Sequence, residues 1–295
     1  MNKCSKLAAL AMGASVLFAS VFTSCGSTAK VASNDKEILV VSFGTSYNSS
    51  RDLTIGGIEN AIAKAFPDYT VARAFTADTI IKILKERENL VIDNVDEALT
   101  RAANNGVKTL VVQPTHLMDG FEYNDLQKIL SKYESKFSKV VLSKPLLSSD
   151  ADFDSVAAAI TAKTAKFDDG KSAICFMGHG TEAESNKIYS KMQETLTAKG
   201  FANYYVGTVE AKPSVEDLVE AIKAKGTYSK VVLLPLMVVA GDHANNDMAG
   251  DEDDSWKSIF KAAGFEVECV LEGLGQDATI QQIYVEHAKA AVKSL

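Results

Sequence analysis

The residues of this sequence best suited to chemistry are two histidines in glycine-rich segments and one glutamate between them. His179 lies between two glycines, His243 lies two residues after Gly241, and Glu210 follows the run Gly-Thr-Val. Flanking glycines let the backbone turn sharply and leave an imidazole ring uncovered. Two imidazoles and a carboxylate with open coordination positions make a competent site for a divalent transition metal.

Such a site needs elements that bring the three side chains together. Each side chain follows an apolar run typical of a buried strand, and such runs alternate with stretches of helical spacing along the chain. This alternation predicts an α/β fold with parallel sheets that are covered by helices on both faces. In such sheets the ligand lies beyond the carboxyl ends of the strands. We therefore expect His179, Glu210 and His243 to meet at one rim.

The expected elements fill the chain after its first 36 residues. The expected strands span residues 37–42, 70–75, 109–113, 140–142, 172–177, 204–208, 230–236 and 266–271. The expected helices span residues 50–66, 77–85 running into 91–105, 124–135, 152–166, 185–199, 214–225, 254–263 and 277–295. The last of these helices has no strand after it, so we expect it to pack back across the surface.

The pattern runs twice, which favours two lobes related by duplication. Phe43 precedes a Gly-Thr pair after the opening strand, as His179 does in the second half. In each half a glycine also lies six residues after a proline that ends a strand. The predicted fold is therefore two similar α/β lobes, over residues 37–150 and 151–295, with a cleft between them and the metal site in the second lobe.

Each candidate residue also has a plainer interpretation. A single histidine or glutamate at a strand end is usually solvated, and only the agreement of three residues on one rim favours a metal site. Phe43 stands in the first half where His179 stands in the second, so we expect the first lobe to supply cleft wall. His116 either faces the cleft or is hydrogen-bonded to the backbone, and His287 is interpreted as structural.

Other charged residues support weaker hypotheses. The acidic run 251–254 is expected to open a helix, where carboxylates complement the positive end of the helix dipole. Attraction of metal cations toward Asp242 and Asp247 is an additional hypothesis. Arg73, near the end of a strand, is a candidate partner for an acidic ligand.

Composition excludes several classes of protein. The chain has 295 residues, is 46% hydrophobic and carries a formal charge of −7. These values are typical of a folded protein, and the clustered basic residues that nucleic acid binding needs are missing. The sequence contains no phosphate loop or dinucleotide fingerprint, so we expect no nucleotide. Cys175 and Cys269 lie in apolar stretches typical of buried free thiols. A disulfide between them is the alternative in an oxidising compartment.

The start of the chain has the features of an export signal. Two lysines precede an apolar run over residues 7–21, which is followed by small residues and Cys25. A single-pass anchor is the alternative, but the run is shorter than the ~20 residues that a membrane span needs. Because Cys25 resembles a lipobox cysteine, we expect a signal peptide over 1–24 and a tether over 25–36. The protein would then lie in the periplasm or cell envelope, attached to the membrane only by lipid.

Four segments carry a resemblance to a known family, namely residues 41–47, 176–181, 207–210 and 235–244. They resemble the motifs of the anaerobic cobalt chelatases, the CbiK-type sirohydrochlorin cobaltochelatases, here in an exported lipoprotein form. That family inserts Co²⁺ into sirohydrochlorin during cobalamin synthesis. It is similar to the class II chelatases, which work without ATP on a bilobal α/β fold. The resemblance covers essentially all of residues 37–295.

The resemblance implies roles for individual residues. His179, Glu210 and His243 would bind the metal, and one of the two catalytic histidines would also take pyrrole protons. The family's motif often has a second histidine shortly after Gly-Thr, whereas Glu182 follows Thr181 here, so an auxiliary metal-feeding role at that position is unsupported. Residues of the first lobe would line the tetrapyrrole cleft: Phe43, Gly44, Thr45, Ser46 and His116.

Export leaves two further functions open, because tetrapyrrole synthesis is usually intracellular. One is an envelope lipoprotein that binds haem, another tetrapyrrole or free metal. The other is a chelatase that removes metal from scavenged tetrapyrrole. The His-Glu-His set favours the inserting enzyme, because a carrier needs only one axial ligand. The ligand types do not distinguish Co²⁺ from Fe²⁺ or Ni²⁺, so the expectation of Co²⁺ as substrate depends on the resemblance alone. A homo-oligomer is a further alternative.

Overall fold

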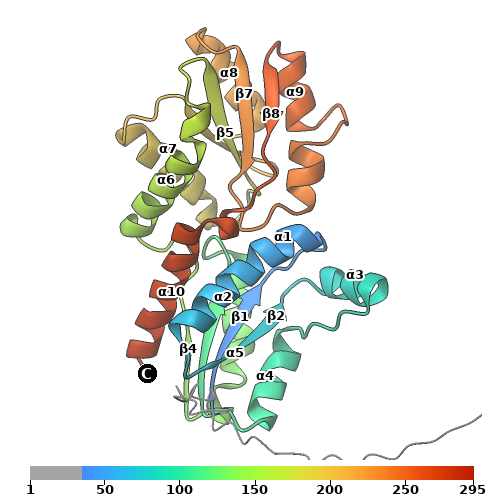
Figure 1. Cartoon of the computed structure of the whole chain (residues 1–295), viewed down its shortest axis with the longest axis vertical. Coiled ribbons are helices and arrows are strands. Elements are labelled where there is room, and N and C mark those ends of the chain that lie inside the picture. The colour runs from blue at the N-terminus through green and yellow to red at the C-terminus, as the bar shows by residue number, and fades with distance from the viewer. Residues whose placement is uncertain (1–34) are drawn as a thin grey trace, which may run out of the picture. The chain divides into compact units, whose positions relative to one another are not determined.

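Two parallel β-sheets form the framework of the protein in its computed structural model, which describes residues 35–295 (Figure 1). The strands are β1 (Lys36–Ser42), β2 (Thr70–Phe75), β3 (Thr109–Pro114), β4 (Lys139–Leu142), β5 (Ser172–Gly178), β6 (Tyr204–Thr208), β7 (Lys230–Pro235) and β8 (Glu266–Cys269). The first sheet has the order β2-β1-β3-β4 and the second has the order β6-β5-β7-β8. Both sheets are parallel throughout. This shared topology confirms the predicted α/β fold with two similar lobes.

Helices connect successive strands, as the alternating pattern predicts. In the first lobe they are α1 (Asn48–Leu53), α2 (Ile55–Ala65), α3 (Asp78–Glu88), α4 (Val95–Asn104), α5 (Phe121–Ser131) and the short η1 (Glu134–Lys136). After β4 come α6 (Asp150–Thr164), η2 (Ala165–Phe167), η3 (Glu184–Asn186), α7 (Lys187–Ala198), α8 (Val215–Lys225), η4 (Ala244–Met248), α9 (Trp256–Ala262), η5 (Leu274–Gln276) and α10 (Ala278–Lys293).

Helices cover both faces of each sheet. Alternate residues of β1 show this, since Ile38 packs with α2 and α10 while Leu39 packs with α4 and α5. In the second lobe Ile174 of β5 faces α6 and α7, whereas Cys175 faces α8 and α9. All four side chains are fully buried. Burial on both faces explains why the strands appear in the sequence as continuous apolar runs.

The last helix joins the two lobes. α10 follows the second sheet but packs on α2, α6 and the edge of the first sheet (Figure 1). The hydroxyl of Tyr284 on α10 donates a hydrogen bond to the carbonyl of Thr115, just past β3, at 2.8 Å. His287 on the same helix lies 3.0 Å from Asp152 of α6. The terminal helix therefore fixes one lobe against the other.

Two sequence expectations about helices are wrong in detail. The helix expected over 50–66 breaks at Thr54, whose hydroxyl donates to the carbonyl of Ser50 at 2.5 Å. The helical stretches expected over 77–85 and 91–105 correspond to α3 and α4, and Asn89, with a left-handed φ of 53°, caps the end of α3. The acidic run 251–254 precedes α9 rather than opening it, since Ser255 caps that helix.

The hypothesis that Arg73 pairs with an acidic ligand is also wrong. Its guanidinium is already bound to the carboxylate of Glu59 on α2, with Nε at 2.7 Å from Oε1. This pair lies on the outer strand β2, and Arg73 is not among the residues that line the cleft described below. Arg73 therefore links α2 to β2.

The predicted signal peptide, the anchor at Cys25 and nearly all of the tether lie outside the described residues. Within residues 35–295, Cys175 and Cys269 are both free thiols. Burial raises the pKa of both, which keeps them protonated. Among the described helices, none combines the length and the apolar character that a membrane span requires.

Candidate metal centre and adjoining cleft

Neighbouring strands bring His179 and Glu210 together. Gly178 at the end of β5 pairs with Thr208 at the end of β6, so the residues that follow leave the sheet side by side. The pairing continues past the strands, because the amide of Glu210 donates to the carbonyl of His179 at 2.9 Å. The Nδ1 atom of His179 lies 3.6 Å from Oε2 of Glu210. The strand-end prediction therefore holds for this pair.

His243 reaches the same rim from the other side of β5. The loop after β7 starts beside β5, where the amide of Leu236 donates to the carbonyl of Met177 at 2.7 Å. The loop then ends in the helical turn η4, and His243 stands directly before it. The rings of His179 and His243 are 4.6 Å apart at their centroids and nearly perpendicular. Ligand atoms of His179, Glu210 and His243 all lie within 4.8 Å of one another.

Hydrogen bonds set which ring nitrogens can bind a metal. Nδ1 of His179 lies 2.7 Å from the carbonyl oxygen of Gly180, and Nδ1 of His243 lies 2.6 Å from Oδ2 of Asp247. A carbonyl or a carboxylate only accepts, so in both rings Nδ1 carries the proton. Each Nε2 therefore keeps a free lone pair. Such outer partners are usual for metal-binding histidines, because they fix the tautomer and the ring orientation.

Asp247 is thus a direct partner of His243, which the sequence hypothesis of general cation attraction did not predict. Residues four apart in a helical turn lie on one face, so the spacing His-x-x-x-Asp was the available signal. The π-helical turn Ala244–Met248 supplies this geometry. Turns of this rare type occur often at functional sites.

The backbone around His179 is held by its own lobe. Gly180 has a φ of +88°, a conformation that residues with a side chain rarely adopt. Its amide donates to the hydroxyl oxygen of Tyr189 on α7 at 3.3 Å. Burial raises the pKa of Tyr189 to about 12, so this hydroxyl stays neutral. No sequence motif indicated that Tyr189 would lie here.

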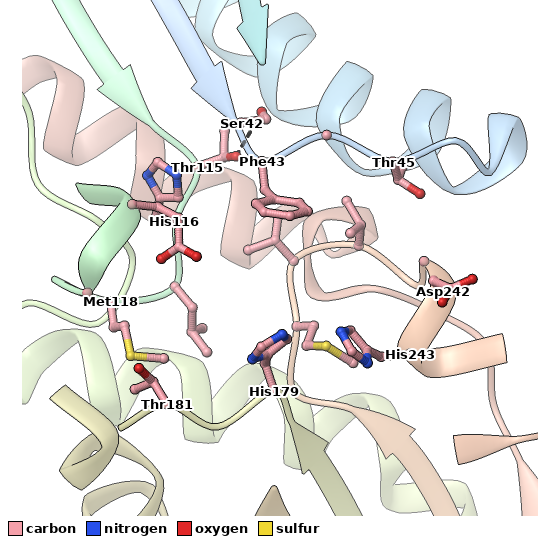
Figure 2. A pocket seen from close by; sticks show the side chains of 18 of the residues that line it. Ser42, Phe43, Thr45, Thr115, His116, Met118, His179, Thr181, Asp242 and His243 are labelled. Atoms are coloured by element: carbon pink, nitrogen blue, oxygen red, sulfur yellow. Dashed lines mark hydrogen bonds between the residues drawn. The ribbon is translucent and has the colours of Figure 1, made fainter. Parts of the chain in front are cut away.

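The three residues lie at the wall of a cleft of about 530 Å³ that both lobes line. Figure 2 shows Phe43 projecting from the end of β1 toward His179 and His243. Phe43 is 51% exposed and Phe121 is 59% exposed, and both line this cleft, so it offers aromatic surface from the first lobe. Gly44, Thr45 and Ser46 continue this wall, as expected. Apolar lining residues that the sequence did not single out are Leu117, Met118, Phe121, Met237, Val238 and Val239.

His116 lines the cleft, but its nitrogens do not face it. Both ring nitrogens are buried and have no hydrogen-bond partner in the described chain, although other atoms of the residue are partly exposed. The alternative that His116 is hydrogen-bonded to the backbone is therefore wrong. Burial lowers the pKa of His116 to about 4, so the ring is neutral.

The charged residues of the cleft are all acidic. Its described lining includes Glu122, Glu182, Glu210 and Asp242 but no lysine or arginine. Glu122 stands on the first-lobe side, two residues after Gly120, as His243 follows Gly241 in the second lobe. This arrangement suits a cation and an apolar ring more than an acidic group placed deep in the cleft.

The chain matches the family model described as cobalt chelatase (CbiK) over residues 36–293. It is 36% identical over 257 residues to the sirohydrochlorin cobaltochelatase of Salmonella typhimurium, covering 87% of this chain and 96% of that protein. It is 28% identical over 262 residues to the sirohydrochlorin cobaltochelatase CbiKC of Nitratidesulfovibrio vulgaris, covering 88% and 92%.

A solved structure shows the same fold at lower identity. SirB from Bacillus subtilis, determined with Fe³⁺, superposes with a TM-score of 0.60 at 12% identity, covering 88% of this chain and 97% of that chain. The family match spans both lobes and every residue of the His-Glu-His cluster. On that match and on the relative with 36% identity, the chain belongs to the cobalt chelatase (CbiK) family.

Proposed function

We propose that the protein inserts Co²⁺ into sirohydrochlorin without a nucleotide. The observation that carries this proposal is the convergence of His179, Glu210 and His243 on one wall of a two-lobed cleft, in a member of the cobalt chelatase family. Relatives that match over most of their length are named sirohydrochlorin cobaltochelatases. Both lobes would act together, with the second lobe binding the ion and the first binding the ring.

The ion would bind through the two free Nε2 atoms and the carboxylate of Glu210. Three protein ligands leave coordination positions open for water and for the nitrogens of the incoming ring. The Glu210 side chain is 55% exposed, so it can move with the ion. The affinity of a His-Glu-His ligand set for a divalent ion depends more on the metal than on the protein. Fe²⁺ and Ni²⁺ are therefore alternative substrates.

Insertion also requires that two pyrrole nitrogens lose their protons. As the ion passes from an imidazole to the ring, the Nε2 lone pair that held it becomes free to accept a pyrrole proton. A pyrrole N–H bond then breaks, an Nε2–H bond forms, and the pyrrole nitrogen bonds to the ion. The second pyrrole proton would pass in the same way to Nε2 of the other histidine when the ion leaves it. Neutral imidazole is suited to both roles near neutral pH. Glu210, 3.6 Å from His179, would stabilise the imidazolium that results.

The ring would lie against the apolar wall that Phe43 begins. An aromatic side chain favours stacked contact with a flat conjugated ring. Carboxylates of sirohydrochlorin would be repelled by the acidic lining of the cleft, so we expect them to point toward solvent. The apolar wall and the acidic lining thus favour one orientation of the substrate, with its flat faces inside.

The test is an anaerobic assay of the purified protein with sirohydrochlorin and Co²⁺, which follows the absorbance change of the ring. We expect many turnovers per protein molecule, at a rate well above that of a protein-free control. A stoichiometric spectral shift without turnover would refute the enzyme and identify a tetrapyrrole carrier. Release of metal from a preloaded ring, without insertion, would identify a chelatase that acts in reverse.

We also propose that the protein is exported and lipid-anchored at Cys25. The support is the sequence of the first 25 residues alone. Cell fractionation with a labelled fatty acid tests this: wild type should carry label in the membrane fraction, and Cys25→Ala should not. Full-length unlabelled protein in the cytoplasm would contradict both parts of the proposal.

A further inference from the structure

The loop that carries His243 is held by the opposite lobe. The amide of Ala240, three residues before His243, donates a hydrogen bond to Oγ of Ser50 at 2.9 Å. Ser50 lies on α1 of the first lobe, and the bonded atoms are buried. This hydrogen bond therefore crosses between residues 190 positions apart in the chain.

Other contacts bring the same two segments together. The hydroxyl of Tyr47 lies 3.5 Å from Oδ1 of Asp242. Gly241 is packed so closely on Thr45 that an added Cβ would lie 3.2 Å from its Oγ1. The segment 43–47, which lines the cleft and leads into α1, therefore lies directly against the loop before His243.

The loop is also supported by its own lobe, where Ala240 is buried in the hydrophobic core and Gly273 packs closely on the Ala240 amide. The side chain of Asn245 donates to the carbonyl of Gly241 at 2.7 Å. Further along the chain, the amides of Leu274 and Gly275, in and beside η5, donate to the carbonyls of Met237 and Val238. None of these bonds satisfies the amide of Ala240. Ser50 is its acceptor, and a buried amide without an acceptor is strongly disfavoured.

We propose that Ser50 is a positioning residue that places His243 for metal binding and joins the ring-binding wall to the metal centre. Ser50 is itself tied to the helix break, because the hydroxyl of Thr54 donates to the Ser50 carbonyl while the Ser50 hydroxyl accepts from Ala240. The kinetic part of this inference rests on the proposed function. The part that concerns Co²⁺ binding does not.

The test compares Ser50→Ala with Ser49→Ala, a matched control at the neighbouring exposed position. Both variants and the wild type are titrated with Co²⁺ in the absence of tetrapyrrole, and the visible absorption of bound Co²⁺ is recorded. We expect Ser50→Ala to bind Co²⁺ about tenfold more weakly and with an altered spectrum, because the loop loses a buried hydrogen bond. Ser49→Ala should match the wild type.

Rescue separates positioning from general stability. Ser50→Cys keeps the shape but is a poorer acceptor, so its affinity should lie between those of Ser50→Ala and wild type. It also replaces Ser50→Ala if that variant does not fold. In insertion assays at a temperature well below unfolding, Ser50→Ala should raise the KM for Co²⁺ more than it lowers kcat.

Wild-type Co²⁺ affinity and spectrum in Ser50→Ala, or in Ser50→Cys when only that variant folds, would overturn the proposal. A lowered unfolding temperature with unchanged Co²⁺ affinity would also overturn it, because Ser50 would then be merely structural. If wild type binds Co²⁺ but inserts none, the proposed function fails. The titration still decides the role of Ser50.

Discussion

The two lobes share a strand order and a turn, yet the same position carries different chemistry in each. Phe43 follows β1 and His179 follows β5, and both precede a Gly-Thr pair. The two glycines have similar positive φ angles, +101° at Gly44 and +88° at Gly180. The same backbone turn thus presents the aromatic ring of Phe43 from one wall of the cleft and the imidazole of His179 from the other. The difference shows that the scaffold fixes position while a single residue decides the chemistry.

A second comparison concerns the two remaining histidines of the cleft. His243 has one nitrogen bound to Asp247 and the other free, whereas both nitrogens of His116 are buried without partners. His116 comes after β3 and His243 after β7, which are inner strands of their sheets, and both residues line the same cleft. A histidine can therefore lie in a binding site without being able to bind a metal. What separates the two is a partner for one nitrogen and access to the other.

The largest effect should come from removing a metal ligand. His179→Ala is expected to lower the rate of Co²⁺ insertion by more than about a hundredfold, since losing even a partner outside the coordination sphere typically lowers affinity or activity 10–100-fold. Steady-state rates with sirohydrochlorin measure this. His287→Gln, on α10 outside the cleft, is the control and should keep a near-normal rate. An unaffected His179→Ala enzyme would remove His179 from the mechanism.

The burial of His116 predicts a loss of stability in acid. The pKa of His116 is about 4 in the folded protein and about 6.5 in an unfolded chain, so below pH 6.5 the unfolded state binds more protons. This contribution is complete above pH 6.5 and is lost as pH falls toward 4. At pH 4.5 the loss amounts to about 2–3 kcal/mol of unfolding free energy.

Denaturant unfolding of wild type and His116→Leu at pH 7.5 and 4.5 measures this contribution. The acid-induced loss should be smaller in His116→Leu by about 2–3 kcal/mol, because leucine has no proton to bind. Other titrating groups are common to both proteins and cancel in the difference. Equal losses would mean that His116 titrates normally and that its nitrogens reach water.

Asp247 should matter less than the ligands but more than other carboxylates. Asp247→Asn removes the charged acceptor from Nδ1 of His243 and is expected to weaken Co²⁺ binding about 10–100-fold. Titration with Co²⁺ measures the change, with Asp253→Asn as a control because Asp253 is exposed in the loop before α9. If the two variants bind Co²⁺ equally well, Asp247 does not orient the ring.

Much of the framework could be predicted because it follows from local pattern. Strands buried on both faces must be apolar throughout, and residues 231–234 show this, since all four are nearly inaccessible. The convergence of His179 and Glu210 could also be predicted, because parallel strands place their carboxyl ends together. The repeated Gly-Thr turn correctly predicted two lobes of the same topology.

The contacts between lobes could not be predicted. The role of Ser50 depends on Ala240, which is 190 residues from it in the chain. The state of His116 depends on how tightly several elements close around its ring, and no local pattern carries that information. Tyr189 likewise reaches Gly180 only through the packing of α7 on its sheet. Such features arise from tertiary packing rather than from local preference.

In the proposed function, the second-lobe wall binds the metal ion and the first-lobe wall binds the ring, and paired binding titrations test this separation most directly. Wild type, His179→Ala and Phe43→Ala would each be titrated anaerobically with Co²⁺ alone and with metal-free sirohydrochlorin alone. We predict that His179→Ala loses Co²⁺ affinity by more than about a hundredfold and keeps its affinity for the ring. Phe43→Ala should bind the ring about tenfold more weakly and Co²⁺ normally. Equal weakening of both ligands in both variants would contradict the account.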